Sequence, residues 1–185
     1  MCVGVVLAAG VSTRFPGNKL LAPLRGRPLV WWAVETVREA LGEVYVVVGH
    51  MAEEVRRASG ADGAVYNPWW ALGLSTSVKA AVAAFVDARC LLFMPGDMPL
   101  VRPDTVREVA RCEGGLTVPT YHGVRGNPVA LCRQAYATAL TEVSGDVGLR
   151  VLIGKVPVRY VEVDDPGVLI DVDTPQDLGR IERLK

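Results

Sequence analysis

Three short runs of apolar residues recur in the first half of the chain, each followed within three residues by a glycine. They span residues 3–7, 44–48 and 90–94 and are rich in valine and leucine. Because no charged residue interrupts them, each is predicted to be a strand buried on both faces of a sheet.

Helical patterns lie between these predicted strands. Residues 29–41 follow Pro28, residues 75–86 open with serines that can cap a helix, and residues 103–112 form a third segment. Strands that alternate with helices of this length predict βαβ units and a mostly parallel sheet.

The second half is less regular but continues the same class. Residues 116–120 and 128–132 are expected to be strands, residues 158–163 alternate as a half-buried strand does, and residues 174–184 predict a closing helix. No repeat or linker divides the chain, so one α/β domain over residues 1–185, with helices on both faces of the sheet, is the simplest interpretation.

Composition narrows the functional class. The 185 residues are 50% hydrophobic and 22% charged, with 20 basic and 20 acidic side chains, which is typical of a globular chain. A nucleic-acid binder usually carries a basic excess, so we expect a small-molecule ligand and no nucleic acid. No apolar run reaches the roughly 18 residues of a membrane span, and a cytoplasmic location without membrane contact is expected by default.

The four cysteines are widely spaced, and no C-x-x-C pair points to zinc. The favoured interpretation is that all four are small buried hydrophobic side chains. One disulfide stays open as an alternative.

The loop after the first strand carries the strongest candidate chemistry. Residues 8–10 are small, which lets backbone N–H groups approach a polyanion, and Arg14 and Lys19 follow with two positive charges. In open α/β sheets ligands bind beyond the carboxyl ends of the strands, so we expect a triphosphate here. The spacing matches neither G-x-x-x-x-G-K-[ST] nor G-x-G-x-x-G.

Carboxylates that could hold a metal follow two later segments. Asp97 comes directly after the third apolar run, and magnesium prefers such oxygen ligands; the alternative is an ordinary turn aspartate. Asp171 and Asp173, at i and i+2, would point the same way on an extended segment. One of the two could complete the metal shell while the other caps the helix that starts at Pro175.

Residues 73–77, with the sequence G-L-S-T-S, form a loop-to-helix junction. Hydroxyl groups and a helix N-terminus favour polar or anionic ligands, and simple capping by Ser75 is the alternative.

The chain resembles the molybdenum cofactor cytidylyltransferase family over nearly its whole length. Residues 7–21 are similar to that family's L-A-A-G-x-S-x-R-x-x-x-x-K-L-L signature, and further motifs follow in the family's order. These motifs occupy residues 23–29, 48–50, 73–77, 96–99, 126–128, 145–148 and 171–175. The departures are Phe15-Pro16-Gly17 after the arginine, Asn127 where a histidine is common, and Leu149 where alanine is usual.

The resemblance implies a Rossmann-like fold of the nucleotide-diphospho-sugar transferase type and transfer of CMP from CTP to the phosphate of molybdopterin, with Mg²⁺ and release of pyrophosphate. It implies catalytic roles for Arg14, Lys19 and Asp97, and favours Asp173 as the second metal ligand beside Asp97. The expected nucleotide-binding residues are Leu7, Ala8, Ala9, Gly10, Ser12, Arg14, Lys19, Gly73, Ser75 and Ser77.

For the acceptor, the resemblance implies Asn127, Asp146 and Arg150. Trp69 or Trp70 could stack on a flat ring, although packing is the favoured role. Contact with a molybdenum enzyme is an expected partnership. Three alternatives remain open: guanylyl transfer, another acceptor such as a sugar phosphate, and a non-catalytic nucleotide-binding or cofactor-delivery protein.

Overall fold

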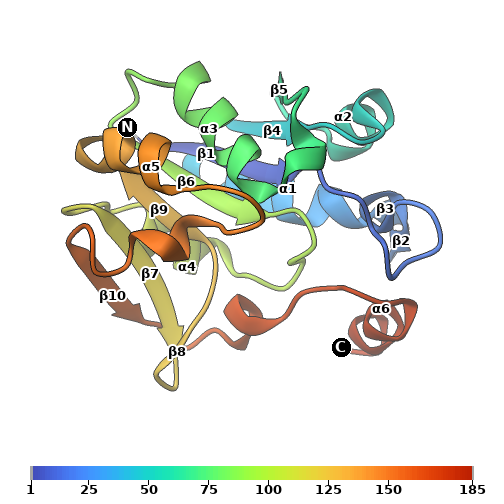
Figure 1. Cartoon of the computed structure of the whole chain (residues 1–185). Helices are drawn as coiled ribbons and strands as arrows, with labels where there is room; N and C mark the ends of the chain where they lie inside the picture. Colours follow the sequence, from blue (N-terminus) through green and yellow to red (C-terminus); the bar gives the residue numbers. More distant parts are fainter. Residues whose placement is uncertain (1, 185) are drawn as a thin grey trace.

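The three apolar runs are strands that lie side by side at the centre of one sheet (Figure 1). In the computed structural model, which describes residues 2–184, β1 (Cys2–Ala8) pairs in parallel with β4 (Val44–Val48) and β6 (Cys90–Pro95). The short β5 (Gly63–Tyr66) extends the sheet in parallel beyond β4. The carboxyl ends of these four strands therefore meet at one edge, as the prediction of βαβ units requires.

The second half of the chain adds one strand that runs antiparallel to both of its neighbours in the sheet. Strand β9 (Val129–Cys132) runs antiparallel to β6 and to β7 (Leu116–Tyr121), β10 (Val158–Glu162) runs parallel to β7, and β8 (Val124–Arg125) forms a hairpin with β7. The strand order is β10-β7-β9-β6-β1-β4-β5. The prediction of a mostly parallel sheet in an α/β domain is confirmed.

Helices cover both faces of this sheet. On one face, α1 (Leu29–Leu41), α2 (Ala52–Ser59) and α4 (Pro103–Val109) bury side chains such as Val34 and Val106 against β1, β4 and β6. On the other face, α3 (Leu74–Ala84) and α5 (Tyr136–Glu142) pack side chains such as Val78 and Ala139. The three layers thus enclose two apolar cores, one on each side of the sheet.

Helix α6 (Pro175–Glu182) closes the domain against the β2 (Pro23–Leu24) and β3 (Arg27–Pro28) hairpin, where Ile181 contacts a small core around Leu24. Its N-terminus carries a capping box, in which Thr174 accepts from the Asp177 N–H and Asp177 accepts from the Thr174 N–H. The expectation that Asp171 or Asp173 caps this helix is wrong, because Thr174 already fills that position.

Some short elements were not predicted. Helix α2 is eight mostly polar residues and β5 is a four-residue edge strand, so neither carries a long apolar period. The irregular second half also contains α5. The part of the chain that the structure describes also contains five 3₁₀ turns: η1 (Lys19–Leu21), η2 (Trp70–Leu72), η3 (Arg133–Ala135), η4 (Leu149–Leu152) and η5 (Pro166–Leu169). Among the helices of residues 2–184, none is long and apolar enough to cross a membrane.

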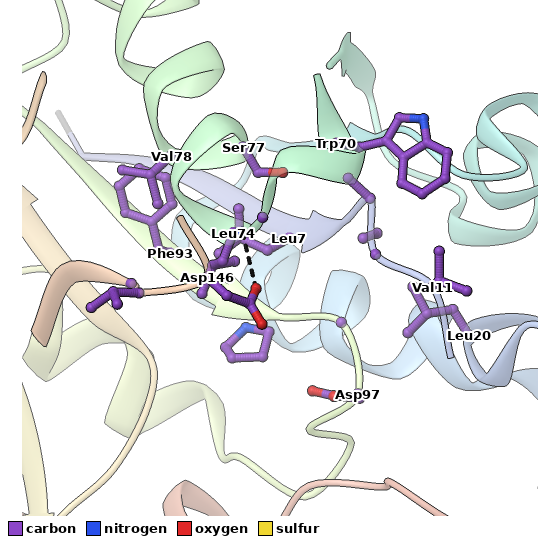
Figure 2. Close-up of a pocket in the computed structure, with 18 of the residues that line it drawn as sticks. Leu7, Val11, Leu20, Trp70, Leu74, Ser77, Val78, Phe93, Asp97 and Asp146 are labelled. Atoms are coloured by element: carbon purple, nitrogen blue, oxygen red, sulfur yellow. Dashed lines mark hydrogen bonds between the residues drawn. The ribbon is translucent and has the colours of Figure 1, made fainter. Parts of the chain in front are cut away.

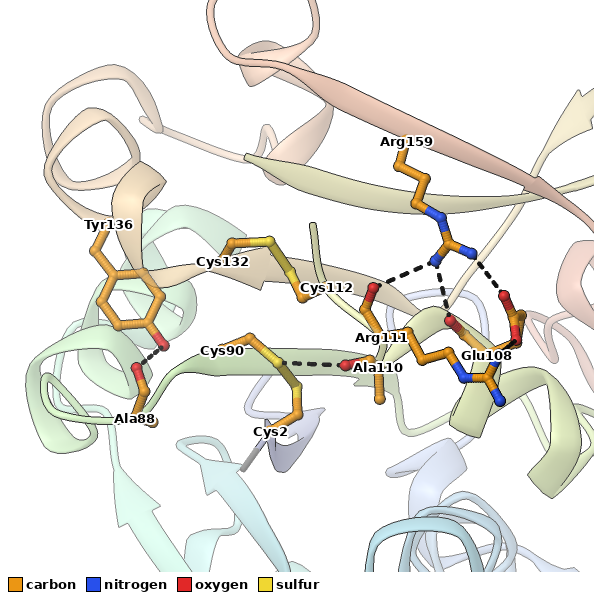
Figure 3. Close-up of a disulfide and its surroundings, with 10 residues drawn as sticks. All are labelled: Cys2, Ala88, Cys90, Glu108, Ala110, Arg111, Cys112, Cys132, Tyr136 and Arg159. Atoms are coloured by element: carbon orange, nitrogen blue, oxygen red, sulfur yellow. Dashed lines mark hydrogen bonds and ion pairs between the residues drawn. A yellow bond between two sulfur atoms is a disulfide. The ribbon is translucent and has the colours of Figure 1, made fainter. Parts of the chain in front are cut away.

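Strand register brings three of the four cysteines together, and Cys112 reaches Cys132 from the segment between α4 and β7. Cys2 pairs with Cys90 across β1 and β6, and Cys90 pairs with Cys132 across β6 and β9. The structure contains the disulfides Cys2–Cys90 and Cys112–Cys132 (Figure 3). The prediction of four unpaired hydrophobic cysteines is therefore wrong, because widely spaced positions became spatial neighbours.

Thiol titration checks this pairing. In unreduced, denatured protein we expect no reactive thiol, and after reduction we expect all four cysteines to react. Four reactive thiols before reduction would contradict both disulfides. Two reactive thiols before reduction would mean that only one of the two disulfides forms.

Candidate active site

The site lies where the carboxyl ends of β1 and β6 meet. The Gly96 N–H donates to the Leu7 carbonyl at 3.0 Å, and a Cβ on Gly96 would lie 3.0 Å from that same oxygen. A residue with a side chain would push the two strand ends apart, so this glycine lets the loops after β1 and β6 face each other.

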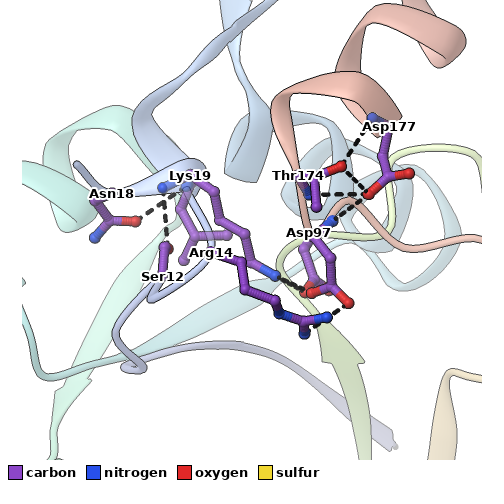
Figure 4. A network of polar contacts seen from close by, with 9 residues as sticks. Ser12, Arg14, Asn18, Lys19, Asp97, Thr174 and Asp177 are labelled. Carbon is purple, nitrogen blue, oxygen red and sulfur yellow. Dashed lines mark hydrogen bonds and ion pairs between the residues drawn. The ribbon is translucent and has the colours of Figure 1, made fainter. Parts of the chain in front are cut away.

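The loop after β1 is held in shape by its own polar side chains (Figure 4). Ser12 Oγ accepts from the Lys19 N–H at 3.0 Å, and the buried Asn18 caps η1 by accepting from the Leu20 N–H at 3.0 Å. These bonds fix the backbone on both sides of Lys19 and leave its side chain free to reach the end of β6.

Lys19 and Arg14 meet two of the predicted carboxylates. Lys19 Nζ lies 2.7 Å from Asp97 Oδ2 and 3.0 Å from Asp173 Oδ1, and Arg14 Nη2 lies 2.8 Å from Asp173 Oδ2 (Figure 4). Residues separated by more than 150 positions along the chain thus form one charged cluster. The structure brings together the three side chains for which a catalytic role is expected.

Asp171 joins the same cluster. Asp97, Asp171 and Asp173 each offer a carboxylate oxygen, and these three oxygens lie within 4.8 Å of one another. An all-oxygen set of carboxylates suits a hard divalent cation such as Mg²⁺. The residues present therefore fit such an ion, and they include Asp171 as well as Asp173, the residue that the resemblance favours. The i and i+2 spacing was the available signal for keeping both.

The pKa values reflect this crowding. Burial lowers the pKa of Lys19, but the charges and hydrogen bonds of Asp97 and Asp173 outweigh it and hold that pKa above its ordinary value. The hydrogen bond from Lys19 leads the causes that lower the pKa of Asp173. Burial of its carboxyl group, together with the charges of Asp97 and Asp173, raises the pKa of Asp171. At Asp171, burial and the two neighbouring carboxylates therefore outweigh the opposing effect of the Lys19 charge on the pKa.

A cleft of about 1180 Å³ opens beside this cluster (Figure 2). Its wall includes most of the residues that the sequence assigned to the nucleotide and the metal: Leu7, Ala8, Ala9, Gly10, Ser12, Lys19, Gly73, Ser77 and Asp97. Arg14 and Asp173 lie just beyond the wall, within the charged cluster. Ser75 is buried and its N–H donates to the Gly145 carbonyl, so it lies behind the cleft.

The residues that the resemblance assigns to the acceptor also line the cleft. They are Asn127, Asp146 and Arg150. The segment that carries Asp146 is fastened to α3, because Asp146 Oδ1 accepts from the Leu74 N–H at 3.2 Å. Gly73 has φ 109, and a Cβ there would lie 2.5 Å from the Gly145 carbonyl, so only glycine allows this close contact.

Asp146 thus acts as an N-terminal cap for α3 from a distant segment. Because the N-cap residue Gly73 has no side chain to offer, Asp146→Ala is expected to lower the free energy of unfolding by about 1 kcal/mol, measured by denaturant titration. The exposed Asp164, changed to alanine, provides the matched control. Equal stability of the Asp146 and Asp164 variants would contradict the capping role.

Of Trp69 and Trp70, the two tryptophans considered for stacking on a flat ring, Trp70 lines the cleft and Trp69 does not. The ring of Trp70 lies 5.2 Å from that of His50, and its Cβ fills the space that a side chain on Gly49 would need. Trp69 is 64% exposed and lies outside the wall. Trp70 therefore has a packing role beside Gly49, which is the role favoured from the sequence, and it also forms part of the cleft wall.

A buried residue that sequence analysis passed over also borders the site. Asn67 is 1% exposed and bonds to the start of α3. Its only sequence signal was its place before Pro68, which is typical of a turn.

Comparison with known proteins finds a family match and similar proteins of about the same length. The family model described as "MobA-like NTP transferase domain" matches residues 4–162. The molybdenum cofactor cytidylyltransferase of Escherichia coli is 26% identical over 179 residues, covering 94% of this chain and 91% of its own.

Two further proteins are similar along their whole length. A nicotine blue oxidoreductase of Paenarthrobacter nicotinovorans is 31% identical, covering 97% of this chain and 96% of its own. A Mycobacterium tuberculosis protein, solved in complex with manganese, is 30% identical with a TM-score of 0.79, and 99% of each chain is covered.

Proposed function

This chain belongs to the MobA-like NTP transferase domain family, a family of nucleotidyltransferases, and on that premise we propose that it transfers CMP from CTP to the phosphate of molybdopterin and releases pyrophosphate. The proposal goes beyond the family in naming the nucleotide, the acceptor and the Mg²⁺ ion. The convergence of Lys19 and Arg14 with three carboxylates at the mouth of the cleft is the observation that carries it.

The two cations suit the triphosphate. Lys19 emerges from the loop that follows β1, next to the small residues 8–10, whose backbone can approach phosphate oxygens closely. In the structure Lys19 and Arg14 are paired with Asp97 and Asp173. When a nucleotide binds, its phosphates compete for these cations, and the carboxylates become free to act as ligands.

Asp97, Asp171 and Asp173 would hold the divalent cation, which supplies charge neutralisation at the phosphates. The manganese bound by the M. tuberculosis relative supports a divalent ion in this family's fold. Two anions must approach each other in the reaction, and without positive charge their repulsion opposes the attack.

The reaction itself needs positioning more than covalent chemistry. An oxygen of the acceptor phosphate attacks the α-phosphorus of CTP, a new phosphorus–oxygen bond forms, and the bond to the bridging oxygen of the β-phosphate breaks. The electron pair leaves with pyrophosphate. Lys19 and Arg14 stabilise the charge that develops on the departing phosphates.

The acceptor half of the cleft favours a flat heterocycle over a sugar. Apolar side chains, including Phe93, Val129 and Leu149, share this wall with Asn127 and Arg150. A sugar phosphate offers many hydroxyl groups that need hydrogen-bond partners, whereas a pterin ring can pack on apolar surfaces and use a few polar contacts. The E. coli relative named as a molybdenum cofactor cytidylyltransferase supports the same acceptor. Hand-over of the product would bring the chain into contact with a molybdenum enzyme.

A product assay tests the proposal. Incubation with molybdopterin, Mg²⁺ and each nucleoside triphosphate in turn is expected to release pyrophosphate with CTP and to raise the mass of the acceptor by one CMP unit. Release with GTP alone would make the chain a guanylyltransferase. Release only with a sugar phosphate would overturn the acceptor. Stable nucleotide binding without turnover would identify a binding or delivery protein.

A further inference from the structure

Asn67 connects the end of β5 to the start of α3 through an unusually complete set of hydrogen bonds. Its own N–H donates to the Val48 carbonyl at 2.8 Å, and its side-chain Oδ1 accepts from the Trp69 N–H at 3.0 Å. Its side-chain Nδ2 donates to Thr76 Oγ1 at 2.8 Å and to Ser77 Oγ at 3.0 Å. Asn67 itself is buried and does not line the cleft.

The orientation of this amide is dictated by the backbone. The Trp69 N–H can only donate, so the atom of Asn67 that faces it must be the oxygen. The NH₂ group consequently faces Thr76 and Ser77, and each of its two hydrogens has one hydroxyl oxygen as its acceptor. A flipped amide would place two donors against each other.

The two hydroxyl groups differ in what they do with their own hydrogens. Thr76 Oγ1 lies 2.8 Å from the Gly73 carbonyl and 3.0 Å from the Trp69 carbonyl, which can only accept, so its hydrogen is used inside the protein. Ser77 Oγ accepts from Asn67, and within residues 2–184 the structure pairs its hydrogen with no acceptor. Ser77 is 4% exposed and lines the cleft beside Val78 (Figure 2).

We propose that Asn67 is a positioning residue for the nucleobase: by donating to one lone pair of Ser77 Oγ, it orients the hydroxyl so that the hydroxyl hydrogen is aimed at an acceptor atom of the base. Cytosine presents two neighbouring acceptors, O2 and N3, and a single amino donor at C4. A donor at Ser77 therefore matches the acceptor edge of cytosine. This inference rests on the proposed use of CTP. It adds Asn67 as the residue that makes Ser77 the donor, and the base the acceptor, in their hydrogen bond.

The test measures nucleotide binding by calorimetry with Mg²⁺ and without acceptor. Ser77→Ala is expected to weaken CTP binding about three- to tenfold, the range for one hydrogen bond. Asn67→Ala is expected to weaken it by a similar or smaller factor, because the freed hydroxyl can rotate. The double variant should bind CTP no more weakly than Ser77→Ala alone, since Asn67 acts through Ser77.

Two probes separate positioning from general loosening of α3. Inorganic triphosphate, which has no base, should bind all variants equally well. The triphosphate of pyrimidin-2-one riboside keeps O2 and N3 of cytosine but lacks the amino group, and the Ser77→Ala penalty should persist with it. Loss of the penalty with this analogue would mean that Ser77 accepts from the amino group, and would overturn the proposal.

Thr76→Val is the matched control, because Thr76 does not line the cleft and its replacement removes the other hydrogen bond of the same amide. The replacement also removes the bonds from Thr76 to the Gly73 and Trp69 carbonyls, so it reports how far loosening of this segment alone affects binding. If Thr76→Val weakens CTP binding as much as Asn67→Ala does, Asn67 is merely structural.

If the Asn67→Ala variant does not fold, Asn67→Ser replaces it, because the single hydroxyl hydrogen of serine cannot form both of the bonds that the Asn67 amide donates. If the wild type binds GTP and not CTP, the proposed nucleotide fails. Additive penalties of Asn67 and Ser77 variants, measured with the nucleotide that does bind, would refute the positioning role itself.

Discussion

Replacing Asp97 with alanine is expected to lower turnover by on the order of 10³-fold, because the variant loses one carboxylate of the proposed metal site, the one that follows strand β6. Charge stabilisation by a bound metal contributes several kcal/mol to such transition states, and each 1.36 kcal/mol corresponds to a factor of ten in rate. The measurement is pyrophosphate release at saturating CTP, together with Mn²⁺ affinity followed by paramagnetic resonance. Both turnover and Mn²⁺ affinity should fall.

Asp97 is partly exposed, with a side chain 20% accessible, so its loss should leave the fold intact. Asp97→Asn tests the same point with the shape preserved and the charge removed. Asp87→Ala, at a carboxylate that is 92% accessible and remote from the cleft, is the control and should retain full activity. Normal turnover and Mn²⁺ affinity in both Asp97 variants would exclude Asp97 from the site.

Replacing Lys19 with alanine should lower turnover by about 10²- to 10³-fold, the range for removal of one preorganised group that stabilises developing charge. Its effect on the metal should be opposite to that of Asp97→Ala. The Lys19 ammonium lies against Asp97 and Asp173, where it competes with a divalent cation. Without nucleotide, the Lys19→Ala variant should therefore bind Mn²⁺ at least as tightly as the wild type.

Lys155→Ala provides the control for Lys19, because Lys155 pairs with Glu142 on the surface. A Lys19→Ala variant that turns over normally would remove the proposed role at the triphosphate. A variant with weakened Mn²⁺ affinity would show that Lys19 supports the carboxylates instead of competing with the metal.

Part of the charged cluster could be predicted from sequence because Arg14, Lys19 and Asp97 lie in the loops that follow strands. Lys19 follows β1 and Asp97 follows β6, and strand ends in a parallel sheet meet at one edge. The role of Asp171 was harder to assign. From sequence, either Asp171 or Asp173 could cap α6 instead of holding a metal. In the structure Thr174 and Asp177 form the capping box of α6, so neither Asp171 nor Asp173 is needed as a cap.

Sequence alone could not predict that Ser77 Oγ accepts a hydrogen bond from Asn67. This bond depends on a backbone donor at Trp69 that orients the Asn67 amide, and backbone orientation in an irregular segment has no periodic signal. The fastening of Asp146 to α3 depends likewise on a contact between residues 72 positions apart.

Short-range apolar patterns and residue spacing are enough to predict the α/β class, the buried central strands and the position of the loop after β1. How strand order brings distant residues together follows only from the three-dimensional fold. The antiparallel insertion of β9 placed Cys132 beside Cys90, and the path of the chain before α6 brought Asp171 and Asp173 to Asp97. Such contacts depend on packing across the whole domain, which local propensity does not encode.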